Sequence, residues 1–368
     1  MYNIAVIFGG ATPEHSISII TAMGAMKNLS LNYNPVPIYI NTAGRWLTGK
    51  HLLDAAAYHN EPSGKECYFK PNCADLYVKN ALTHSKIKID CALLCLHGGG
   101  YEGGTVQGVL KLAGVPVTSP EVLPSVICMD KVVSKLLFKS LNIDTPKFVW
   151  GVANGSVGEL AEKAVEKLKF PLIVKPARCG SSVGIKLAGN EEELNEAVEY
   201  AAQFDKKVIV EEALTDFREL NISLVRGKGE IKFSSVEEVE SEHKFYTFDD
   251  KYTRKSTTKR SVPADISVKI LGKILKISTA VYETLEMDGI VRFDFLVAGD
   301  KVYLNEVNTI PGSFAFYLWK NEGVSFAQLL NISIKAALAK SSDKSTAKVE
   351  YNREVLRDLD KIKAIVDK

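Results

Sequence analysis

Short, continuously apolar runs alternate with amphipathic stretches through the first third of the chain. Ile4–Phe8 is apolar throughout and ends at a pair of glycines, and residues 16–29 then carry apolar side chains at helical spacing. The apolar pattern recurs twice downstream, in Val36–Ile40 and Cys91–Leu96. Continuous apolar runs are typical of strands buried on both faces, and helices between them favour a parallel sheet. We therefore predict an α/β fold that opens with a parallel α/β domain over residues 1–120.

A second unit is predicted over residues 121–212. A capping box at Ser156–Glu159 precedes apolar residues that recur on one side of a helix, and Asn190 stands where it can cap another helix. Short apolar runs predict two strands in this unit, Phe170–Val174 and Val208–Val210.

A third unit is predicted over residues 213–340, followed by a charged tail over residues 341–368. Residues 237–262 are polar and hold no helical period, so we interpret them as a long functional loop. A helix is predicted from about Asp265, and after it two strands, around Arg292–Val297 and Val302–Val307. Apolar residues at helical spacing in the tail predict one more amphipathic helix.

Polar residues with metal-binding chemistry lie on the last two predicted strands. Ile290–Leu296 alternates strictly, which places Arg292 and Asp294 on one face. Glu306 and Asn308 share a face of the next strand, so these side chains converge if the two strands pair as a hairpin. Two carboxylates and an amide oxygen are hard ligands that suit Mg²⁺ held with substrate phosphates. The alternative is an exposed strand face whose charges are solvated.

A glycine–serine loop follows the strand predicted at Phe170–Val174. It runs from Lys175 to Gly184, and the backbone N–H groups and hydroxyls of such a loop can cradle phosphate, with a simple turn as the alternative. Glu14, near a predicted helix N-terminus, and His97, after a predicted strand, each allow a binding role or a structural one. The chain has no Walker A or GxGxxG motif, which disfavours P-loop and dinucleotide sites.

Composition narrows the classes of function. The chain has 368 residues, of which 46% are hydrophobic and 24% charged, and a net charge of +2. This composition is ordinary for a globular protein, and without a basic stripe a nucleic-acid partner is not expected. The first residues lack a secretory signal, and no run of about 18 apolar residues predicts a membrane span. The six cysteines show neither zinc spacing nor a disulfide framework, so we expect a reducing, cytoplasmic location.

Seven segments, in their order and spacing, make residues 3–335 resemble the D-alanine–D-alanine ligases of bacterial cell-wall synthesis. Each motif is short, but seven in register are specific. The matching positions are Gly9, Gly10, Glu14 and Ser18; His97, Gly98, Glu102, Gly104, Thr105, Gln107 and Gly108; Met129, Asp130 and Lys131; Lys175 to Gly184; Phe245, Tyr246, Lys251 and Tyr252; Arg292 and Asp294; and Glu306, Asn308, Thr309, Pro311 and Gly312.

The resemblance implies a three-domain ATP-grasp fold, α+β in its ATP-grasp part, with ATP between the central and C-terminal domains. Lys131 and Lys175 are expected on the phosphates and Glu219 on the ribose. Lys251 is expected at the same ATP site, and the adenine is expected against Glu211, Glu212, Ala213 and Leu214. Two Mg²⁺ ions, or Mn²⁺ in their place, are expected on Asp294, Glu306 and Asn308.

The resemblance also implies how two amino acids are held and joined. Glu14, Ser181 and Tyr252 are expected to form a hydrogen-bonded triad that fixes the first amino acid. Arg292 and the Gly312 backbone are expected to stabilise the oxyanion. One D-alanine would be activated as an acyl phosphate and attacked by the amine of a second, in a homodimer with no membrane or nucleic-acid partner. Further substrate contacts are expected from Ile17, His97, Tyr317 and Leu318.

The chain departs from the family pattern in three places, one of which is the tail after residue 341, beyond the usual end of the family. Tyr101 and Gly103 replace the usual residues after His97, and Tyr317 stands where the family usually has a serine that binds the carboxylate of the second amino acid. Tyr252, in contrast, favours an amine acceptor over a hydroxy acid. Two alternatives therefore stand beside a D-alanine–D-alanine ligase: a sister ligase with another acceptor, and a non-catalytic nucleotide-binding protein. The complete set of expected metal ligands argues against the second.

Overall fold

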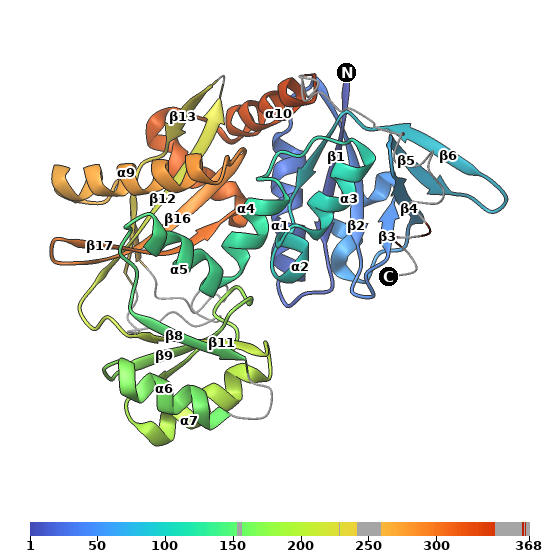
Figure 1. The fold of residues 1–368 in the computed structure, drawn as a ribbon. Helices are drawn as coiled ribbons and strands as arrows, with labels where there is room; N and C mark the ends of the chain where they lie inside the picture. The colour runs from blue at the N-terminus through green and yellow to red at the C-terminus, as the bar shows by residue number, and fades with distance from the viewer. Residues whose placement is uncertain (153–156, 228, 241–258, 343–362, 364, 366–368) are drawn as a thin grey trace.

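The computed structural model describes residues 1–152, 157–227, 229–240, 259–342, 363 and 365. Three β-sheets organise these residues (Figure 1). A seven-stranded sheet holds the N-terminal part, a six-stranded sheet lies beside it, and a small four-stranded sheet lies below both in Figure 1. The mixed α/β fold predicted from the sequence is confirmed. None of the helices in the described ranges is long and apolar enough to span a membrane.

The N-terminal sheet is built on a parallel core. Its strand order is β6-β5-β4-β3-β2-β1-β7, and β1 (Tyr2–Gly9) pairs in parallel with β2 (Tyr33–Ile40) and β7 (Cys91–Leu94). These are the three strands that the apolar runs predict, and residues 4–8 and 91–96 are completely buried. The helices that follow these strands are α1 (His15–Asn28), α2 (Gly99–Glu102) and α3 (Thr105–Ala113).

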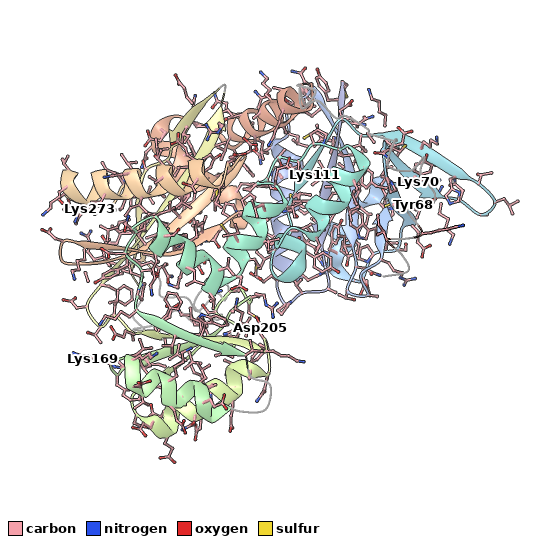
Figure 2. All side chains as sticks on the ribbon, viewed as in Figure 1. Tyr68, Lys70, Lys111, Lys169, Asp205 and Lys273 are labelled. Carbon is pink, nitrogen blue, oxygen red and sulfur yellow. The ribbon has the colours of Figure 1, made fainter. Side chains whose placement is uncertain are left out.

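Four antiparallel strands, which the sequence pattern does not predict, extend this sheet. On their outer face Tyr68 stacks on Tyr77 with ring centroids 5.6 Å apart, beside Lys70 (Figure 2). Polar, half-exposed strands carry no long apolar signal, which is why the pattern misses them. They are β3 (Trp46–Thr48), β4 (Lys65–Lys70), β5 (Cys73–Lys79) and β6 (His84–Lys88), with the 3-10 helices η1 (Lys50–Leu53) and η2 (Ala55–His59) between β3 and β4.

The four-stranded sheet is antiparallel throughout, in the order β10-β9-β11-β8. Two helices, α6 (Val157–Lys167) and α7 (Glu191–Ala202), cover its outer face (Figure 1). The predicted cap of α7 is confirmed, because the Asn190 side chain accepts from the Glu193 N–H at 2.9 Å. Ser156, the predicted cap of α6, lies outside the described residues. The strands are β8 (Phe148–Val152), β9 (Leu172–Pro176), β10 (Lys186–Ala188) and β11 (Lys207–Glu212).

The six-stranded sheet has the order β15-β14-β12-β16-β17, with β13 paired to β12. Its strands are β12 (Arg218–Gly227), β13 (Glu230–Phe233), β14 (Glu237–Glu240), β15 (Lys259–Ser261), β16 (Ile290–Ala298) and β17 (Lys301–Asn308). The helical segments around it are α4 (Val122–Met129), α5 (Lys131–Ser140), α9 (Val268–Thr284), η3 (Gly312–Glu322) and α10 (Phe326–Ser342). The predicted strand pair β16–β17 and the helix α9 before it are confirmed.

The ends of the predicted loop 237–262 are strands. Residues 237–240 form β14 and residues 259–261 form β15, and the two pair antiparallel. The prediction of a loop is wrong at these two ends. In β14, Glu237 and Val239 alternate as buried residues, and a charged side chain in a buried position hides the alternation. The residues of β15 are all exposed and carry no apolar pattern. Residues 241–258, and the tail after residue 342 apart from 363 and 365, lie outside the described residues.

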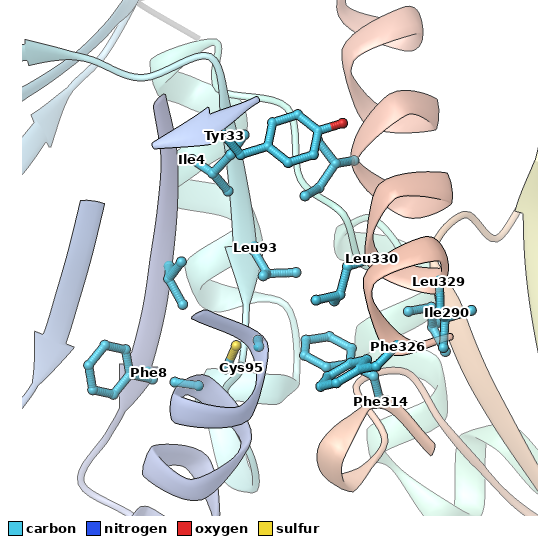
Figure 3. Packing of buried hydrophobic residues seen from close by; sticks show 14 of the residues in the cluster. Ile4, Phe8, Tyr33, Leu93, Cys95, Ile290, Phe314, Phe326, Leu329 and Leu330 are labelled. Carbon is cyan, nitrogen blue, oxygen red and sulfur yellow. The ribbon is translucent and has the colours of Figure 1, made fainter. Parts of the chain in front are cut away.

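The N-terminal and C-terminal sheets share a hydrophobic core (Figure 3). Leu93 and Cys95 of the first unit belong to the same cluster as Phe314, Phe326 and Leu330 of the last. The four-stranded sheet has a separate core with α6 and α7. Helices α4 and α5 contribute Cys128 and Phe138 to the core of the six-stranded sheet, although the sequence grouped them with the central unit. The division into domains at 120, 212 and 340 stays a prediction.

Candidate active site

Two adjoining cavities lie where the three sheets meet. The first, of about 390 Å³, lies between the four-stranded and six-stranded sheets. The second, of about 630 Å³, lies between the six-stranded sheet and the carboxyl ends of the parallel N-terminal strands, where parallel sheets usually hold ligands. Both cavities therefore open onto one seam. The residues that line both are Lys131, Gly180, Ser181, Glu219, Val239 and Glu306.

A buried group of charges lies at one wall of the first cavity and contributes Lys175 and Glu211 to its lining. Lys175 on β9 donates to Glu211 on β11 at 2.9 Å, and Lys135 Nζ on α5 lies 3.2 Å from the other oxygen of Glu211. Burial lowers the pKa of Lys135 to about 8. Burial opposes ionisation of Glu211 as well, but the two lysines lower its pKa below the ordinary value. Two cations around one carboxylate leave a positive wall that suits phosphate oxygens.

Sequence reasoning did not single out Lys135. It stands four residues after Lys131 in α5, so the two lysines share a helix face. This spacing is the signal that could have found it.

Lys131 is the first residue of α5, and the start of this helix is fixed from two sides. Asp130 caps the helix by accepting from the N–H groups of Val132 and Val133 at 3.0 and 3.1 Å. Asp130 also pairs with Lys207 Nζ on β11 at 2.8 Å. The cap thereby holds Lys131 at the seam, where its Nζ donates to the Cys179 carbonyl at 2.6 Å.

The glycine–serine loop brings Ser181 into the second cavity. Ser181 and Ser182 have positive φ values of 50° and 61°, a conformation that side chains other than glycine adopt rarely and mainly at functional sites. The Ser181 hydroxyl donates to Glu14, which follows β1. Gly98 is required beside them, because a Cβ there would lie 2.1 Å from the Glu14 carboxylate. The structure thus joins Glu14 and Ser181 as the resemblance implies.

A histidine and a glutamate are buried at the inner end of the second cavity. His97 Nε2 lies 2.9 Å from the Thr21 hydroxyl, and burial lowers the pKa of His97 to about 4, so its ring is neutral at physiological pH. Glu102 accepts from the Gly98 N–H at 3.1 Å and from the Ile310 N–H at 3.4 Å. Burial, aided by the nearby Glu14 carboxylate, raises the pKa of Glu102 to about 8. The inner end therefore carries little net charge at neutral pH.

The β16–β17 hairpin brings its four polar residues together, as the alternation predicts. Asp294 pairs with Glu306 and Arg292 with Asn308 across the ladder, and an irregularity between Asp294 and Phe295 leaves Asn305 as the extra residue. Arg292 donates to both carboxylate oxygens of Asp294, from Nε at 2.6 Å and from Nη2 at 2.7 Å. Although burial opposes its charge, Asp294 raises the pKa of Arg292 above the ordinary value.

The donor set at this hairpin has the chemistry of a magnesium site. Glu306 lines both cavities, and Asn308 lines the second, directing its Nδ2 to Asp294 at 2.9 Å. Carboxylate and amide oxygens are the ligands that Mg²⁺ prefers. Among the described residues no three His, Cys, Asp or Glu side chains form a metal-binding group. Two carboxylates and an amide suit ions that are held jointly with bound phosphates.

A left-handed backbone turn shapes the far wall of the second cavity. Ser313, Phe314 and Ala315 follow Gly312 with φ values of 49°, 56° and 48°. Successive left-handed residues cost roughly 1–2 kcal/mol each, so this turn persists only because its surroundings hold it. Phe314 and Ala315 are buried in the shared core, and the turn presents Tyr317 to the cavity.

Tyr317 belongs to a network that the sequence did not reveal. Its hydroxyl donates to Glu237 Oε1 at 2.7 Å and accepts from Arg260 Nη1 at 2.9 Å. Arg260 also pairs with Glu237 at 3.3 Å, and the Asn221 amide donates to the same carboxylate at 3.1 Å. Glu237 and Arg260 lie at the two ends of a stretch that looked like a uniform polar loop, so no local pattern marked them.

The structure places most of the predicted site residues around the two cavities. Ala213 and Asp294 are not in the wall of either cavity, and Asp294 is buried against Arg292. The Leu318 side chain is buried in the shared core. Tyr252 and Lys251 lie outside the described residues. Glu211, Glu212, Leu214, Glu219, Lys131, Lys175, Ser181 and Glu306 line the first cavity; Glu14, Ile17, His97, Lys131, Ser181, Glu219, Arg292, Glu306, Asn308, Gly312 and Tyr317 line the second.

The arrangement suits the transfer of a phosphoryl group across the seam. Lys131 and Lys175 line the first cavity, the carboxylates of Glu219 and Glu306 line both, and Arg292 lines the second. Preorganised cations and donors stabilise negative charge that develops on oxygen atoms during such a transfer. The two cavities can therefore present a phosphate donor and a small carboxylate to each other.

Two sequence profiles of known families match the chain. One, described as the D-ala D-ala ligase N-terminus, matches residues 3–120, and the other, the D-ala D-ala ligase C-terminus, matches residues 137–335. The D-alanine–D-alanine ligase of Thermosipho africanus is 37% identical over 353 residues, which cover 94% of this chain and 96% of that protein.

Solved structures show the same similarity. The VanG D-Ala:D-Ser ligase from Enterococcus faecalis superposes with a TM-score of 0.78 at 29% identity, over 91% of this chain and 98% of that one. The D-alanine–D-alanine ligase from Bacillus anthracis, in complex with ATP, superposes with a TM-score of 0.70 at 26% identity, over 94% of this chain and 100% of that one. By sequence and by fold, this chain belongs to the D-alanine–D-alanine ligase family, whose members are ATP-dependent ligases with the ATP-grasp fold.

Proposed function

We propose that this protein joins two D-alanine molecules to D-alanyl-D-alanine at the expense of ATP, for the synthesis of peptidoglycan precursors. The observation that carries the proposal is the pair of cavities that meet at Lys131, Ser181 and Glu306. One cavity has the cations for a nucleotide, and the other has the Glu14–Ser181 pair for an amino acid. ATP use also supports the cytoplasmic location expected from the sequence.

The first cavity is proposed as the ATP site. Lys131 and Lys175 hold the phosphates, Glu219 the ribose, and Glu211 to Leu214 the adenine. The first amino acid sits in the second cavity against Glu14 and Ser181, with its carboxylate toward the seam. This carboxylate attacks the terminal phosphorus of ATP, which yields an acyl phosphate and ADP, and the amine of the second amino acid then displaces phosphate.

Arg292 and the Gly312 backbone N–H stabilise the oxyanion of the second step, since charge develops on the former carboxyl oxygen. Asp294, Glu306 and Asn308 are the residues that would hold two Mg²⁺ ions, or Mn²⁺, and bound ions would neutralise the charge on the phosphates. Arg292 also orients Asp294 through its bidentate pair, so one residue serves both the metal ligands and the oxyanion.

Tyr317 favours a second candidate, a ligase of the same chemistry with another acceptor. The residue differs from the serine usual in the family, and one structural relative is named a D-Ala:D-Ser ligase. D-serine is therefore the first alternative acceptor to be examined.

A homodimer is also proposed. Helix α4 contacts both α3 and α5, and the three helices carry exposed apolar side chains: Val109 and Leu112 on α3, Leu123 and Val126 on α4, and Val133 and Leu136 on α5. A large exposed apolar patch is typical of an interaction site. A second copy of the chain fits this face because the family resemblance implies a dimer.

The test is phosphate release from Mg-ATP with D-alanine as sole amino acid, and with L-alanine as the control. We expect D-alanine-dependent release and a stoichiometric dipeptide by mass spectrometry. A product formed only when D-serine is added would favour the second candidate. ATP binding without phosphate release in any amino-acid mixture would refute both.

A further inference from the structure

A third cavity, of about 310 Å³, lies apart from the two that form the candidate active site. Its walls come from α3, from the chain that follows α3 at residues 114–119, from α10 and from the two residues before β16. The cavity therefore lies where the first unit meets the last. Small-molecule sites usually have volumes of roughly 300–1,000 Å³, so this cavity suits a small ligand.

Two buried polar side chains line this cavity. Gln107 is 1% exposed and Thr118 is 4% exposed. Within the described part of the chain, neither Gln107 Oε1 nor Thr118 Oγ1 has a hydrogen-bond partner. An unpaired buried polar atom is costly, and native proteins usually pair such atoms with protein, water or a ligand. The two atoms therefore point to a ligand that carries hydrogen-bonding groups.

The neighbours of Gln107 determine which end of its amide is the unpaired one. Gln107 Nε2 donates to the Glu102 carbonyl at 3.4 Å and to the Ser125 hydroxyl at 3.2 Å. Because a carbonyl oxygen can only accept, the amide cannot be turned the other way. Gln107 thus offers an acceptor, and its ligand must carry an N–H or O–H group.

The backbone of Thr118 is fixed by both units that meet at the cavity. Its N–H donates to the Ala92 carbonyl on β7 at 3.0 Å, and its carbonyl accepts from the Ser333 hydroxyl on α10 at 2.9 Å. Gly289 packs against the same carbonyl, since a Cβ at Gly289 would lie 2.0 Å from its oxygen. The Thr118 hydroxyl therefore belongs to a preformed wall, and it can donate or accept.

Four charged side chains of the cavity wall balance one another. Lys340 pairs with Asp288 at 2.7 Å and lies 3.6 Å from Glu121, and Lys111, labelled in Figure 2, pairs with Glu121 at 2.8 Å. Two cations and two carboxylates give no net charge, which disfavours a phosphate, a nucleotide or a metal ion as ligand. Each ammonium has three N–H groups, so it can keep its pair and also donate to a ligand carboxylate.

The remaining wall is largely apolar. Val115, Pro116 and Val117 line one side, and Ala336 and Ala337 of α10 line the other. Small side chains on α10 leave room for a branched aliphatic group, which gains free energy when it leaves water. A molecule that combines a donor, a carboxylate and a small apolar body without net charge is a zwitterionic aliphatic amino acid.

We propose that the third cavity binds a small aliphatic amino acid as a zwitterion. Its ammonium group donates to Gln107 Oε1 and Thr118 Oγ1, and its carboxylate accepts from Lys111 and Lys340. The side chain packs against the apolar wall beside Ala336. This site goes beyond the proposed function, since it is separate from both cavities of the candidate active site and needs no ATP.

The experiment is a calorimetric titration of the full chain with L-valine, without ATP. L-valine carries all three groups, and its hand distinguishes it from D-alanine. We expect saturable binding of one molecule per chain. Isobutylamine is L-valine without its carboxylate, and isovalerate is L-valine without its ammonium group. We expect each to bind at least about tenfold more weakly, because each loses one charge-assisted contact.

Two variants test whether L-valine binds in this cavity. Ala336→Leu fills the cavity with a side chain, and we expect it to abolish binding. Thr118→Val keeps the shape and removes the hydroxyl, and we expect about fivefold weaker binding, the share of one hydrogen bond. Ala280→Leu is the matched control: Ala280 is half-buried, as Ala336 is, in a helix of the same 17-residue length, α9, and does not line the cavity. Its affinity for L-valine should equal that of the unaltered protein.

The proposal is overturned if the unaltered protein does not bind L-valine at millimolar concentration, because water would then satisfy the two buried atoms. It is also overturned if Ala336→Leu and Thr118→Val bind L-valine as the unaltered protein does, since the ligand would then lie in another cavity. Equal affinity for L-valine and isobutylamine would contradict recognition of the carboxylate. These results are independent of phosphate release with D-alanine, so the proposed function and this site can fail separately.

Discussion

At the scale of single residues, the site depends on where each charge is placed. Glu306 is one of two carboxylates that line both cavities, with Glu219, and it lies opposite Asp294 in the β16–β17 ladder. It is also the residue on which the proposed metal site most depends, because the other carboxylate, Asp294, is held by Arg292 through both oxygens.

We predict that Glu306→Gln keeps the fold and lowers turnover by about 100-fold or more, because a neutral amide binds Mg²⁺ poorly and metal ligands tolerate little change. Steady-state phosphate release over a range of Mg²⁺ concentrations measures the effect. Asp300→Asn is the control: Asp300 is an exposed acid on the turn of the same hairpin, and its variant should retain turnover within about twofold. Near-normal turnover of Glu306→Gln would refute the assignment of Glu306 as a metal ligand.

His97 makes stability depend on pH in a definite direction. Burial lowers its pKa from 6.5 to about 4, so between these values the unfolded chain binds a proton that the folded chain does not. The contribution of His97 to stability is thus complete above pH 6.5 and is lost as the pH falls toward 4. At about 1.4 kcal/mol per pKa unit, the loss is about 3 kcal/mol.

We therefore predict that His97→Gln is less stable than the unaltered protein at pH 7 and that the difference shrinks steadily from pH 6.5 to pH 4. Urea unfolding at each pH measures it. Comparing variants is necessary because Glu102, with its raised pKa, gives the opposite slope above pH 4.5. His84→Gln, at an exposed position of β6, should follow the unaltered protein at every pH. A difference that does not vary with pH would contradict this account.

Individual site residues could be predicted from the sequence where a motif marked them. Strand alternation predicted a shared face for Arg292, Asp294, Glu306 and Asn308, which pair across the β16–β17 ladder. The resemblance predicted that Glu14 contacts Ser181, and the two side chains are hydrogen-bonded. Glu237 and Arg260 could not be found in this way. Both residues belong to the site because they contact Tyr317, which is 57 or more residues away in the chain. The sequence alone does not distinguish a buried glutamate from an exposed one.

At the scale of secondary structure, the cap of helix α5 fixes the position of Lys131, the first residue of that helix. Asp130 caps α5 and pairs with Lys207 on β11, which joins the four-stranded sheet to the helix that begins with Lys131. The Lys131 N–H also donates to the Ala177 carbonyl at 2.9 Å.

We predict that Asp130→Ala lowers stability by about 2 kcal/mol, roughly half from the lost cap and half from leaving Lys207 unpaired, and raises the KM for ATP several-fold. Asp130→Asn keeps a capping oxygen and loses only the ion pair, so it should recover about half of the stability. Thermal melting and ATP titration measure the two effects. Equal destabilisation by alanine and asparagine would mean that the cap contributes nothing.

The elements that could be predicted are those with a strong local pattern. Long apolar runs predicted β1, β2 and β7, and Asn190 was predicted as the N-cap of α7. Strands β3 to β6 and β14 to β15 could not be predicted, because they are short, polar on one face or charged in a buried position. Their pairing depends on neighbours in the sheet, which a local pattern does not contain.

At the scale of the whole molecule, the buried clusters form two bodies. The N-terminal and C-terminal sheets share one core, so they are expected to move together, while the four-stranded sheet has its own. A small cluster of Val132, Ala177 and Ile209 joins this sheet to α5. The first cavity lies between the two bodies. Relative motion of the smaller one is the natural way to admit and retain a nucleotide.

The proposed dimer face belongs to the larger body. Helices α3, α4 and α5 lie on the side of the molecule that faces the viewer in Figure 1, and Lys111 on α3 is labelled on the same side in Figure 2. Leu112 and Leu123 are the most exposed apolar residues of this face, at 67% and 66%. In an isolated chain, changing them costs little stability, because no packing is lost. In a dimer they would be buried, so a charge there would have to be desolvated.

We predict that the unaltered protein has the mass of two 40.4 kDa chains by light scattering, and that Leu112→Glu with Leu123→Glu shifts it to one chain. The melting temperature of the variant should then become independent of protein concentration, since dissociation no longer accompanies unfolding. Leu82→Glu, at a 97% exposed position between β5 and β6, controls for the effect of a new charge and should remain dimeric. A monomeric unaltered protein at tens of micromolar would refute the dimer. A dimer that persists in the double variant would show that the chains meet through another face.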